Sequence, residues 1–515
     1  MGTDRKHAWP LAASVMAAAI LIAPLWCVAS PAMPDYPAHL ATFHLLAGGA
    51  SHYYRIHWAF IPNLAAEIAV PALARFVALG AATKLFLSAA VAMWVMGPAL
   101  IHRALYGRFG VAPLIAAFFA YNANFMWGFL NYYFAAGLAL LVFAAWIATE
   151  NRRGVFSLAG FMLAVTIIYF CHVFAAFALL MMIGCFELGV LMAQRPVAFR
   201  NVPRQLLSTA IIFIPCAFAF VFLKPHGADS GHLEFNFAAS AMDRVEAMLQ
   251  WNYDNPAFSL LAVIAAFLLI GLWRRWIVLH RKMIFVLIAF ALGAALAPEW
   301  AMGGWGVDLR LPAILCVLVF AAADLQVPPL YAKLLAVVCM GTLIYCAATL
   351  AGNWRYYDRQ YSEFRAASQS IVPNAKLLTV LDGDSIGKAS DQPYWHMAEF
   401  AIIDRGAFTP LMFTTRGQHV VRLPRALQAI AASSAQEGSP PDTSELNDLA
   451  AGSIDGDIDI AEVFPYLMYY QCHFDQAVII HLNGNRSPLP NILHLRLAGS
   501  FFSLYDIQRT GCPKQ

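Results

Sequence analysis

The sequence predicts an α-helical polytopic membrane protein with a small C-terminal extracytoplasmic α/β domain. Of its 515 residues, 61% are hydrophobic and only 12% are charged, whereas an average soluble domain has roughly 25% charged residues. Apolar runs of about 15 to 25 residues alternate with short basic clusters, which is typical of a chain that crosses a membrane many times. The formal net charge of +3 is too small to indicate a nucleic-acid partner, and no basic face interleaved with aromatic residues occurs.

About eleven apolar spans, here called transmembrane helices, are expected before residue 351. Several are short for a hydrocarbon core of about 30 Å, which needs roughly 20 residues, so 111–148 and 155–193 can each be a helical hairpin with a tight turn. The first span follows a short charged head and precedes a poor cleavage site, which indicates a retained signal anchor. The expected spans lie near residues 10–29, 76–100, 111–125, 128–148, 155–171, 173–193, 207–223, 257–273, 284–298, 309–324 and 329–350.

The placement of arginine and lysine predicts the orientation in the membrane. Basic residues crowd one set of connections, as at Arg152-Arg153, whereas the opposite set holds few, such as Arg55. The bias alternates across every expected span. It therefore predicts a cytoplasmic N-terminus and puts the loop 32–75 on the periplasmic side of an inner (cytoplasmic) membrane. With an odd number of spans, the tail 352–515 is expected on that outer side too.

The tail 352–515 differs in composition from the membrane domain 1–351 and reads as a small α/β domain. The expected strands are Lys376–Leu381, Gln476–His481 and Phe501–Tyr505, the expected helices are 395–405 and 424–433, and the expected loop is Gly438–Asp442. Seven of the nine cysteines lie in or beside apolar spans. The other two, Cys472 and Cys512, can form a disulfide if the tail is extracytoplasmic.

The outer loop 32–75 opens with Met33-Pro-Asp-Tyr-Pro-Ala-His-Leu40. Asp35 is expected to be the N-cap of a helix with proline in its first turn, which runs until Gly48-Gly49. Such a cap is worth about 1 kcal/mol. A carboxylate with a pKa of about 4 is also ionised at neutral pH and can accept a hydroxyl proton, so Asp35 is the candidate catalytic base. His39 lies one helical turn later and faces the same way.

The rest of this loop is rich in histidine, aromatic and basic residues, which is too elaborate for a mere connection. Besides His39, the candidates for substrate binding in the loop are Arg55 and His57. The histidines lack a tight ligand spacing such as His-x-x-x-His. We therefore expect no cofactor, and a divalent metal is the less favoured alternative.

Four residues near later outer turns are further candidates for substrate binding. Lys84 lies inside the second span, where a charge must face a cavity or a partner unless it snorkels to the interface. Arg310 lies at the outer end of the tenth span, where a guanidinium suits a phosphate; the alternative is an ion pair with Asp308. Asn131 and His172 lie at outer turns, where a hydrogen-bonded structural role is the alternative to substrate binding.

The topology resembles the GT-C superfamily of polytopic glycosyltransferases, which includes protein O-mannosyltransferases, aminoarabinose transferases and arabinosyltransferases. The likeness covers one span, a long outer loop that opens with an acidic residue, ten or so further spans and an outer C-terminal domain. The Pro34–Leu40 segment resembles the first-loop acidic motif of these enzymes, and Asp35 matches its acidic residue. The adjacent acidic pair often seen there is absent, because Asp35 is flanked by Pro34 and Tyr36.

The resemblance implies a sugar donor on a polyprenyl phosphate in the lipid bilayer and an extracytoplasmic glycan, lipid or protein acceptor. Asp35 would take the proton of the acceptor hydroxyl in a single, inverting displacement at the anomeric carbon. Lys84, Arg55 and Arg310, in falling order of preference, would stabilise the leaving phosphate. Asp35, Lys84 and Arg310 are then expected to converge on one outward-facing cavity.

Two other functions compete with transfer. A transporter or flippase of lipid-linked saccharides also has many spans and buried charges, although the second half of the chain does not repeat the first. A non-catalytic envelope assembly protein would use the outer tail for binding, and Asp35 would then be dispensable.

Overall fold

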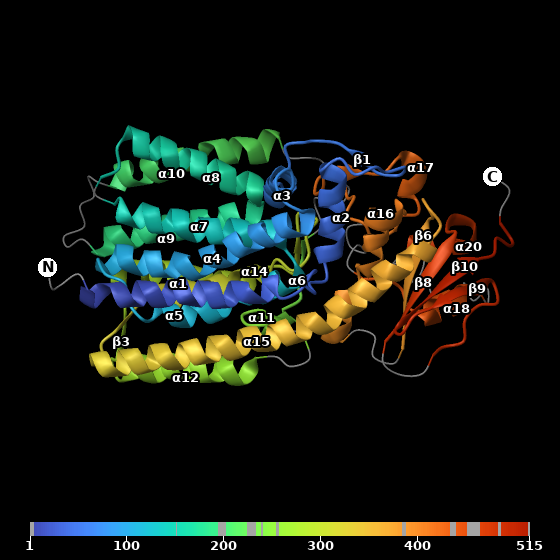
Figure 1. The fold of residues 1–515 in the computed structure, drawn as a ribbon. Coiled ribbons are helices and arrows are strands. Elements are labelled where there is room, and N and C mark those ends of the chain that lie inside the picture. Colours follow the sequence, from blue (N-terminus) through green and yellow to red (C-terminus); the bar gives the residue numbers. More distant parts are fainter. Residues whose placement is uncertain are drawn as a thin grey trace.

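The computed structural model describes residues 5–150, 152–193, 202–223, 233–237, 240–253, 257–383, 388–432, 439–450, 464–482 and 486–512. Long helices lie side by side in a bundle, and a four-stranded sheet lies at its far end from the N-terminus (Figure 1). Short helices, among them α2 (Tyr36–Leu46), α3 (Ala65–Leu73) and α16 (Phe400–Arg405), lie between the bundle and the sheet.

Five of the described helices are long and apolar enough to cross a membrane, which makes the protein membrane-embedded. They are α1 (Arg5–Trp26), α4 (Leu79–Tyr106), α7 (Leu130–Ala148), α9 (Val173–Ala193) and α15 (Pro329–Ala367). Shorter apolar helices accompany them: α8 (Val155–Cys171), α10 (Val202–Phe222), α12 (Phe258–Trp273), α13 (Ile284–Leu296) and α14 (Arg310–Ala322). A total of eleven crossings stays a prediction.

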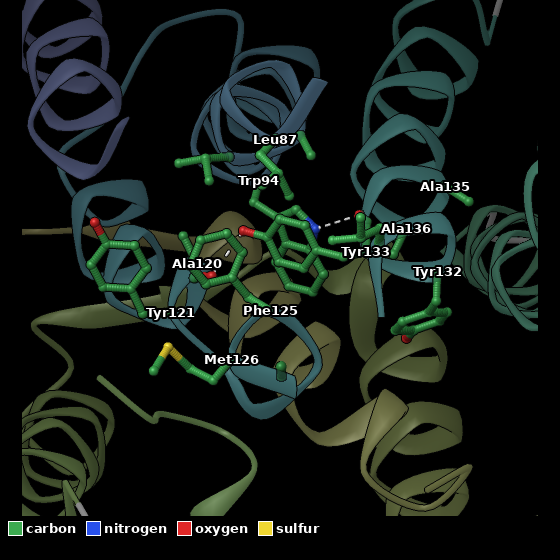
Figure 2. Packing of buried hydrophobic residues seen from close by; sticks show 14 of the residues in the cluster. Leu87, Trp94, Ala120, Tyr121, Phe125, Met126, Tyr132, Tyr133, Ala135 and Ala136 are labelled. Carbon is green, nitrogen blue, oxygen red and sulfur yellow. Dashed lines mark hydrogen bonds between the residues drawn. The ribbon is translucent and has the colours of Figure 1, made fainter. Parts of the chain in front are cut away.

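The bundle is held together by close packing of aromatic and small side chains, most extensively between α4 and α7. Figure 2 shows Trp94 of α4 stacked beside Tyr133 of α7, with ring centroids 4.9 Å apart, and the indole N–H donating to the Tyr133 carbonyl. Gly137 lets the helices approach, since a Cβ there would lie 2.9 Å from the Met93 Cβ. Stacked rings and small residues at the contact are how helices associate in a lipid environment.

The expected span at 111–125 is wrong. The stretch forms three short pieces instead of one helix: α5 (Pro113–Ala116), η1 (Ala117–Ala120) and α6 (Ala123–Trp127). A broken backbone is tolerated at membrane depth only where protein surrounds it, and residues 113–126 are all buried. Groups from other segments supply the missing partners: the Tyr133 hydroxyl donates to the Ala120 carbonyl, and the Gln250 N–H donates to the Tyr121 carbonyl at 2.8 Å. The hairpin expected over 111–148 is therefore absent.

The tight hairpin expected over 155–193 is confirmed. The helices α8 and α9 pack against each other and are joined by the single extended residue His172. In the outer loop, α2 begins directly after Asp35, carries Pro37 in its first turn and ends before Gly48, whose φ is +98°. This confirms the expected helix and its N-cap residue, but the Asp35 side chain makes no capping hydrogen bond.

The C-terminal sheet has the strand order β6-β8-β10-β9, in which β6 and β8 are parallel and the other pairs antiparallel. Its strands are β6 (Leu377–Asp382), β8 (Gln476–His481), β9 (Leu493–Ala498) and β10 (Phe502–Ile507). The three expected strands are confirmed; β9 was not expected and is the largely exposed edge strand. Cys472 and Cys512 form a disulfide with their Cα atoms 5.6 Å apart, which is the pairing that the sequence allowed if the tail is extracytoplasmic.

The two helices expected in the tail are shorter than predicted. The first is divided into η6 (Met397–Glu399) and α16, and the second is reduced to α17 (Arg425–Gln428). Of the expected loop, Gly438 lies outside the described residues. The remaining elements are β1 (Arg55–Ile56), β2 (Leu233–Glu234), α11 (Ser240–Glu246), β3 (Ile277–Leu279), η3 (Arg281–Met283), β4 (Trp300–Ala301), β5 (Ala323–Leu325), η4 (Ser368–Ser370), η5 (Ala389–Tyr394), β7 (Val421–Arg422), α18 (Thr443–Ala450), η7 (Pro465–Leu467) and α20 (Tyr470–His473).

Two connections fix the tail against the bundle. The helix α15 continues without a break across the expected boundary at 351/352, and its Arg365 makes an ion pair with Asp404 of α16 at 2.6 Å. In addition, β1 of the loop 32–75 pairs antiparallel with β7 of the tail. This loop is therefore held between the bundle and the tail.

Candidate functional site

Asp35 lies at the junction of the bundle, the outer loop and the tail. Its backbone N–H donates to the Trp127 carbonyl at 3.1 Å, and only 14% of its side chain is exposed. Gly128, which follows Trp127, has a φ of +95°, and a Cβ there would lie 3.0 Å from the Asp35 Cβ. Glycine is therefore needed at this turn for its conformation and for the close approach of the Asp35 side chain.

The tail supplies the residues that face the Asp35 carboxylate. His396 Nε2 lies 3.9 Å from Asp35 Oδ1, and His396 Nδ1 lies 3.8 Å from Glu399 Oε2. The side chains of His396 and Glu399 are fully buried. Burial raises the pKa of Asp35 to about 7, and the nearby His396 opposes this rise. Asp35 can therefore take up or release a proton near neutral pH.

Three imidazoles surround the Phe413 ring beside Asp35. Its centroid lies 5.3 Å from that of His39, 4.9 Å from that of His396 and 5.2 Å from that of His419. Burial, together with a neighbouring histidine, lowers the pKa of both His39 and His419 to about 3. These two rings are therefore neutral at physiological pH and serve as hydrogen-bonding and packing groups near the carboxylate.

Arg310 is a buried cation, and its expected partner, Asp308, forms an ion pair with Arg244. This ion pair has a length of 3.3 Å, and the charge of Asp308 also acts on the Arg310 guanidinium. The Arg310 guanidinium lies over the rings of Phe129 and Tyr132 and, at 4.6 Å, over that of Phe174.

Arg310 is 7% exposed, and its Nη2 donates to the Trp305 carbonyl at 3.1 Å. Within the described part of the chain, its Nε and Nη1 have no hydrogen-bond partner. Unsatisfied donors on a buried cation are costly and suit an anionic ligand.

A row of partly exposed indoles connects the surroundings of Asp35 with those of Arg310. Trp395, which precedes His396, lies edge-to-face on Trp127 at 5.6 Å, and Trp127 lies edge-to-face on Trp305 at 4.9 Å. Trp305 accepts the Arg310 hydrogen bond through its carbonyl. Asp35 and Arg310 are thus placed against one turn, Trp127–Phe129, and one aromatic surface.

Lys84, Arg55 and His57 have other surroundings. The Lys84 ammonium donates to the Val28 carbonyl and lies over the Trp26 ring at 5.7 Å, which ties α4 to the end of α1. Arg55 is exposed on β1 and donates to carbonyls of its own loop, including that of Tyr54 at 3.1 Å. His57 is exposed beside β7. The contacts of Lys84 and Arg55 do not include Asp35 or Arg310.

Asn131 and His172 take part in structural contacts near the site. Asn131 Oδ1 accepts from the Ala66 N–H at 2.7 Å, and its Nδ2 donates to the Glu67 carboxylate at 2.8 Å. His172 Nδ1 accepts from the Phe174 N–H at 3.2 Å. The His172 ring also packs on Tyr132, which places it beside Arg310. Asn131 therefore anchors α3, whereas His172 supports the aromatic surroundings of Arg310.

Sequence reasoning did not identify the residues that the tail brings to Asp35: His396, Glu399, Phe413, His419 and Trp395. A histidine and a glutamate within the apolar stretch 393–403 are the one signal that was available, since both are unfavourable in a core without partners. Among the described residues, no group of three or more His, Cys, Asp or Glu side chains is arranged to hold a metal ion.

The fold and the site define a helical membrane protein in which a C-terminal α/β domain covers a buried carboxylate. No protein-family model and no curated protein matches the chain. Among solved structures, the chain is similar to the arabinofuranosyltransferase AftD from Mycobacteria, determined by single-particle cryo-EM, with a TM-score of 0.45 and 15% identity. The match covers 98% of this chain and 40% of that one. Activity must therefore be argued from the residues of the site.

Proposed function

We propose that the protein is a membrane glycosyltransferase that moves a sugar from a polyprenyl-phosphate donor to an extracytoplasmic glycan, lipid or protein acceptor. The observation that carries this proposal is the pairing, along one aromatic surface, of a carboxylate that titrates near neutral pH with an unsatisfied buried guanidinium. The chemistry of the proposed transfer requires both a base and a cation.

Asp35 is the proposed general base. The acceptor hydroxyl oxygen attacks the anomeric carbon while its proton passes to the Asp35 carboxylate, and the bond from that carbon to the phosphate oxygen breaks. A single displacement of this kind inverts the anomeric centre. A base with a pKa of about 7 suits this step, because general-base catalysis is most efficient near the operating pH.

Arg310 is the proposed partner of the leaving phosphate, in place of Lys84 and Arg55. The donor phosphate diester becomes a monoester, so negative charge grows on the leaving oxygen as the sugar departs. The unsatisfied Nε and Nη1 of Arg310 leave N–H donors available to phosphate oxygens. Lys84 already has a carbonyl partner, and Arg55 is exposed to solvent.

The indoles of Trp395, Trp127 and Trp305 are proposed to hold the sugar between base and cation. Their partly exposed rings offer apolar surface against which a sugar ring can pack. The disulfide of the tail and the asymmetric placement of arginine and lysine support an orientation in which this surface faces the periplasm, with the chain in the inner membrane and its N-terminus in the cytoplasm.

The test is transfer in proteoliposomes supplied with polyprenyl-phosphate pentoses and hexoses and with envelope glycan acceptors. Asp35→Asn should reduce the transfer rate by about 10²- to 10⁴-fold, the usual contribution of a general base. The matched control is Asp506→Asn, which removes an exposed carboxylate of β10. Unchanged transfer by Asp35→Asn would exclude the general-base role, and movement of intact donor across the bilayer without transfer would favour a flippase.

A further inference from the structure

A cavity lies beside α15, and neither Asp35 nor Arg310 lines it. It has a volume of about 190 Å³ and is lined by Asn353, Tyr356 and Tyr357 of α15 and by Asn252 and Tyr253, which precede α12. Two amides and three phenol rings therefore share one small space. None of the lining side chains carries a charge at neutral pH.

The lining residues are held in place by one another and by their neighbours. Asn353 Nδ2 donates to Asn252 Oδ1 at 2.9 Å, which fixes both amides. Tyr357 lies edge-to-face on both Tyr253, at 5.9 Å, and Tyr356, at 5.2 Å. Tyr253 and Tyr357 are buried, whereas 52% of Tyr356 is exposed. A site whose side chains are already ordered loses less entropy when it binds a ligand.

Tyr253 connects this cavity to the Asp35 segment. Its hydroxyl donates to the carbonyl of Ala32, three residues before Asp35, and approaches the Met126 carbonyl at 3.4 Å. Burial is the main reason that the pKa of the Tyr253 phenol is raised well above its usual range, and the charge of Asp35 adds to the rise. The cavity is therefore within electrostatic reach of the proposed base.

The lining chemistry selects a neutral ligand rich in hydroxyl groups. Amides donate to and accept from hydroxyls, and aromatic faces pack against the C–H groups of a sugar ring. A phosphate would need a cation, which the lining lacks. We propose that this cavity binds a sugar ring of the acceptor glycan. This proposal rests on the proposed function, because the donor's phosphate is assigned to Arg310 and only the uncharged acceptor fits here.

The test is binding of soluble methyl pentosides and methyl hexosides to the full chain in nanodiscs, followed by saturation-transfer NMR. Asn353→Ala and Tyr356→Ala should each weaken binding by about five- to tenfold, because each removes one hydrogen-bonding or ring contact. Tyr356→Trp keeps an aromatic face and should retain binding. The matched control is Tyr345→Ala, which removes a 68% exposed ring from an earlier turn of α15.

Three results would overturn the site. Either no methyl glycoside binds the wild-type chain, or binding is unchanged in both alanine variants, or only octyl glycosides bind, since the alkyl chain rather than the sugar would then be recognised. Asp35→Asn separates this proposal from the proposed function. Binding that survives in Asp35→Asn while transfer is lost supports both, whereas transfer that survives in Asp35→Asn refutes the general base and leaves the sugar site standing.

Discussion

Two carboxylate–imidazole pairs in this protein differ in the distance between the carboxylate oxygen and the imidazole nitrogen. In the tail, Asp382 Oδ2 lies 3.0 Å from His481 Nδ1, and His481 Nε2 lies 2.9 Å from the Ser503 hydroxyl. At the junction, Asp35 and His396 approach only to 3.9 Å. The first pair is a closed hydrogen-bonded relay across β6, β8 and β10, and the second is an open pair at the candidate site.

The pKa values of the two carboxyl groups follow this geometry. Burial alone would raise the pKa of Asp382, but hydrogen bonds from His481, Ser487 and Thr443 outweigh it and hold the pKa below its usual range. Asp35 receives no such bond to its carboxylate from the backbone of its own helix, and burial raises its pKa to about 7. Donors to the carboxylate thus decide whether a buried acid stays ionised.

The comparison also shows why residue types alone do not define a catalytic site. Asp382, His481 and Ser503 have the order of contacts found in a Ser-His-Asp triad. Ser503, however, is 1% exposed near the start of β10, and its hydroxyl already has a partner. The relay therefore serves to fix the order of the strands, whereas the open pair retains an acid that can react.

The largest expected effect is on the closed relay. Asp382→Ala leaves a buried imidazole, a threonine hydroxyl and an N–H without their acceptor, and should destabilise the tail by about 3–5 kcal/mol. Thermal unfolding followed by tail-specific proteolysis measures the loss. Asp506→Asn on the exposed face of the same sheet is the control, and an equal loss from both variants would remove the distinction between closed and open pairs.

The next effect is on the cation that faces the open site. Arg310→Met keeps the aromatic packing but removes the donors, and should lower the transfer rate by about 10²- to 10³-fold. Arg310→Lys should restore only part of this rate, because a single ammonium cannot reproduce the planar fork. Arg244→Lys is the comparison, since that cation is paired with Asp308. A donor dependence that is the same in wild type and Arg310→Met would refute the phosphate role.

The third effect is a dependence on pH. Since Asp35 must be ionised to act as a base, transfer should rise about tenfold per pH unit below its pKa of about 7 and level off above it. Because the pKa of Asp35 is raised from 3.8 to about 7 in the folded protein, the native state binds more protons than the unfolded state between these pH values. Asp35 therefore lowers the stability of the fold as the pH rises through this range.

Asp382 should show the reverse dependence, because its pKa is lowered in the fold. Its contribution to stability is present above its usual pKa and is lost as pH falls through the lowered value. The contribution of each carboxyl group to the pH dependence of stability is the difference in unfolding free energy between wild type and its Asn variant, Asp35→Asn or Asp382→Asn. It is measured from below pH 3.8 to about pH 7. Slopes of the same sign would mean that the two carboxylates do not differ as described.

The smallest effect is expected at the end of the relay. Ser503→Ala removes one hydrogen bond to His481 and should cost about 1 kcal/mol of stability, with the transfer rate unchanged. Ser500→Ala, which removes the hydroxyl bond to Glu363 at the nearby turn, is its matched control. A loss of transfer in Ser503→Ala without a loss of stability would assign a chemical role to the relay.

The sequence was sufficient where local chemistry determines the structure. Apolar runs located the long helices, Pro37 and Gly48 bounded α2, and the three expected strands of the tail were found within a residue or two. The broken stretch α5–η1–α6 was missed because its backbone hydrogen bonds are completed by groups from other segments, such as the Tyr133 hydroxyl and the Gln250 N–H. No local sequence pattern indicates which distant groups will complete the backbone hydrogen bonds of such a stretch.

The candidate site was predictable only in part for the same reason. Asp35 and Arg310 were identified from their chemistry at outer positions, but the partners of each could not be. Asp308, two residues away, was the evident partner of Arg310, yet it pairs with Arg244 from another loop. His396 reaches Asp35 only because α15 and the β1–β7 pairing bring the tail onto the first outer loop.

The length of the helix α15 determines where the tail lies. Its 39 residues correspond to about 58 Å at 1.5 Å per residue, roughly twice the hydrocarbon thickness of a bilayer. Its C-terminal half therefore sets both the distance of the tail from the bundle and the direction in which the tail faces. One residue added to that half would turn the tail by about 100° and move His396 away from Asp35, without any change to the side chains of the site.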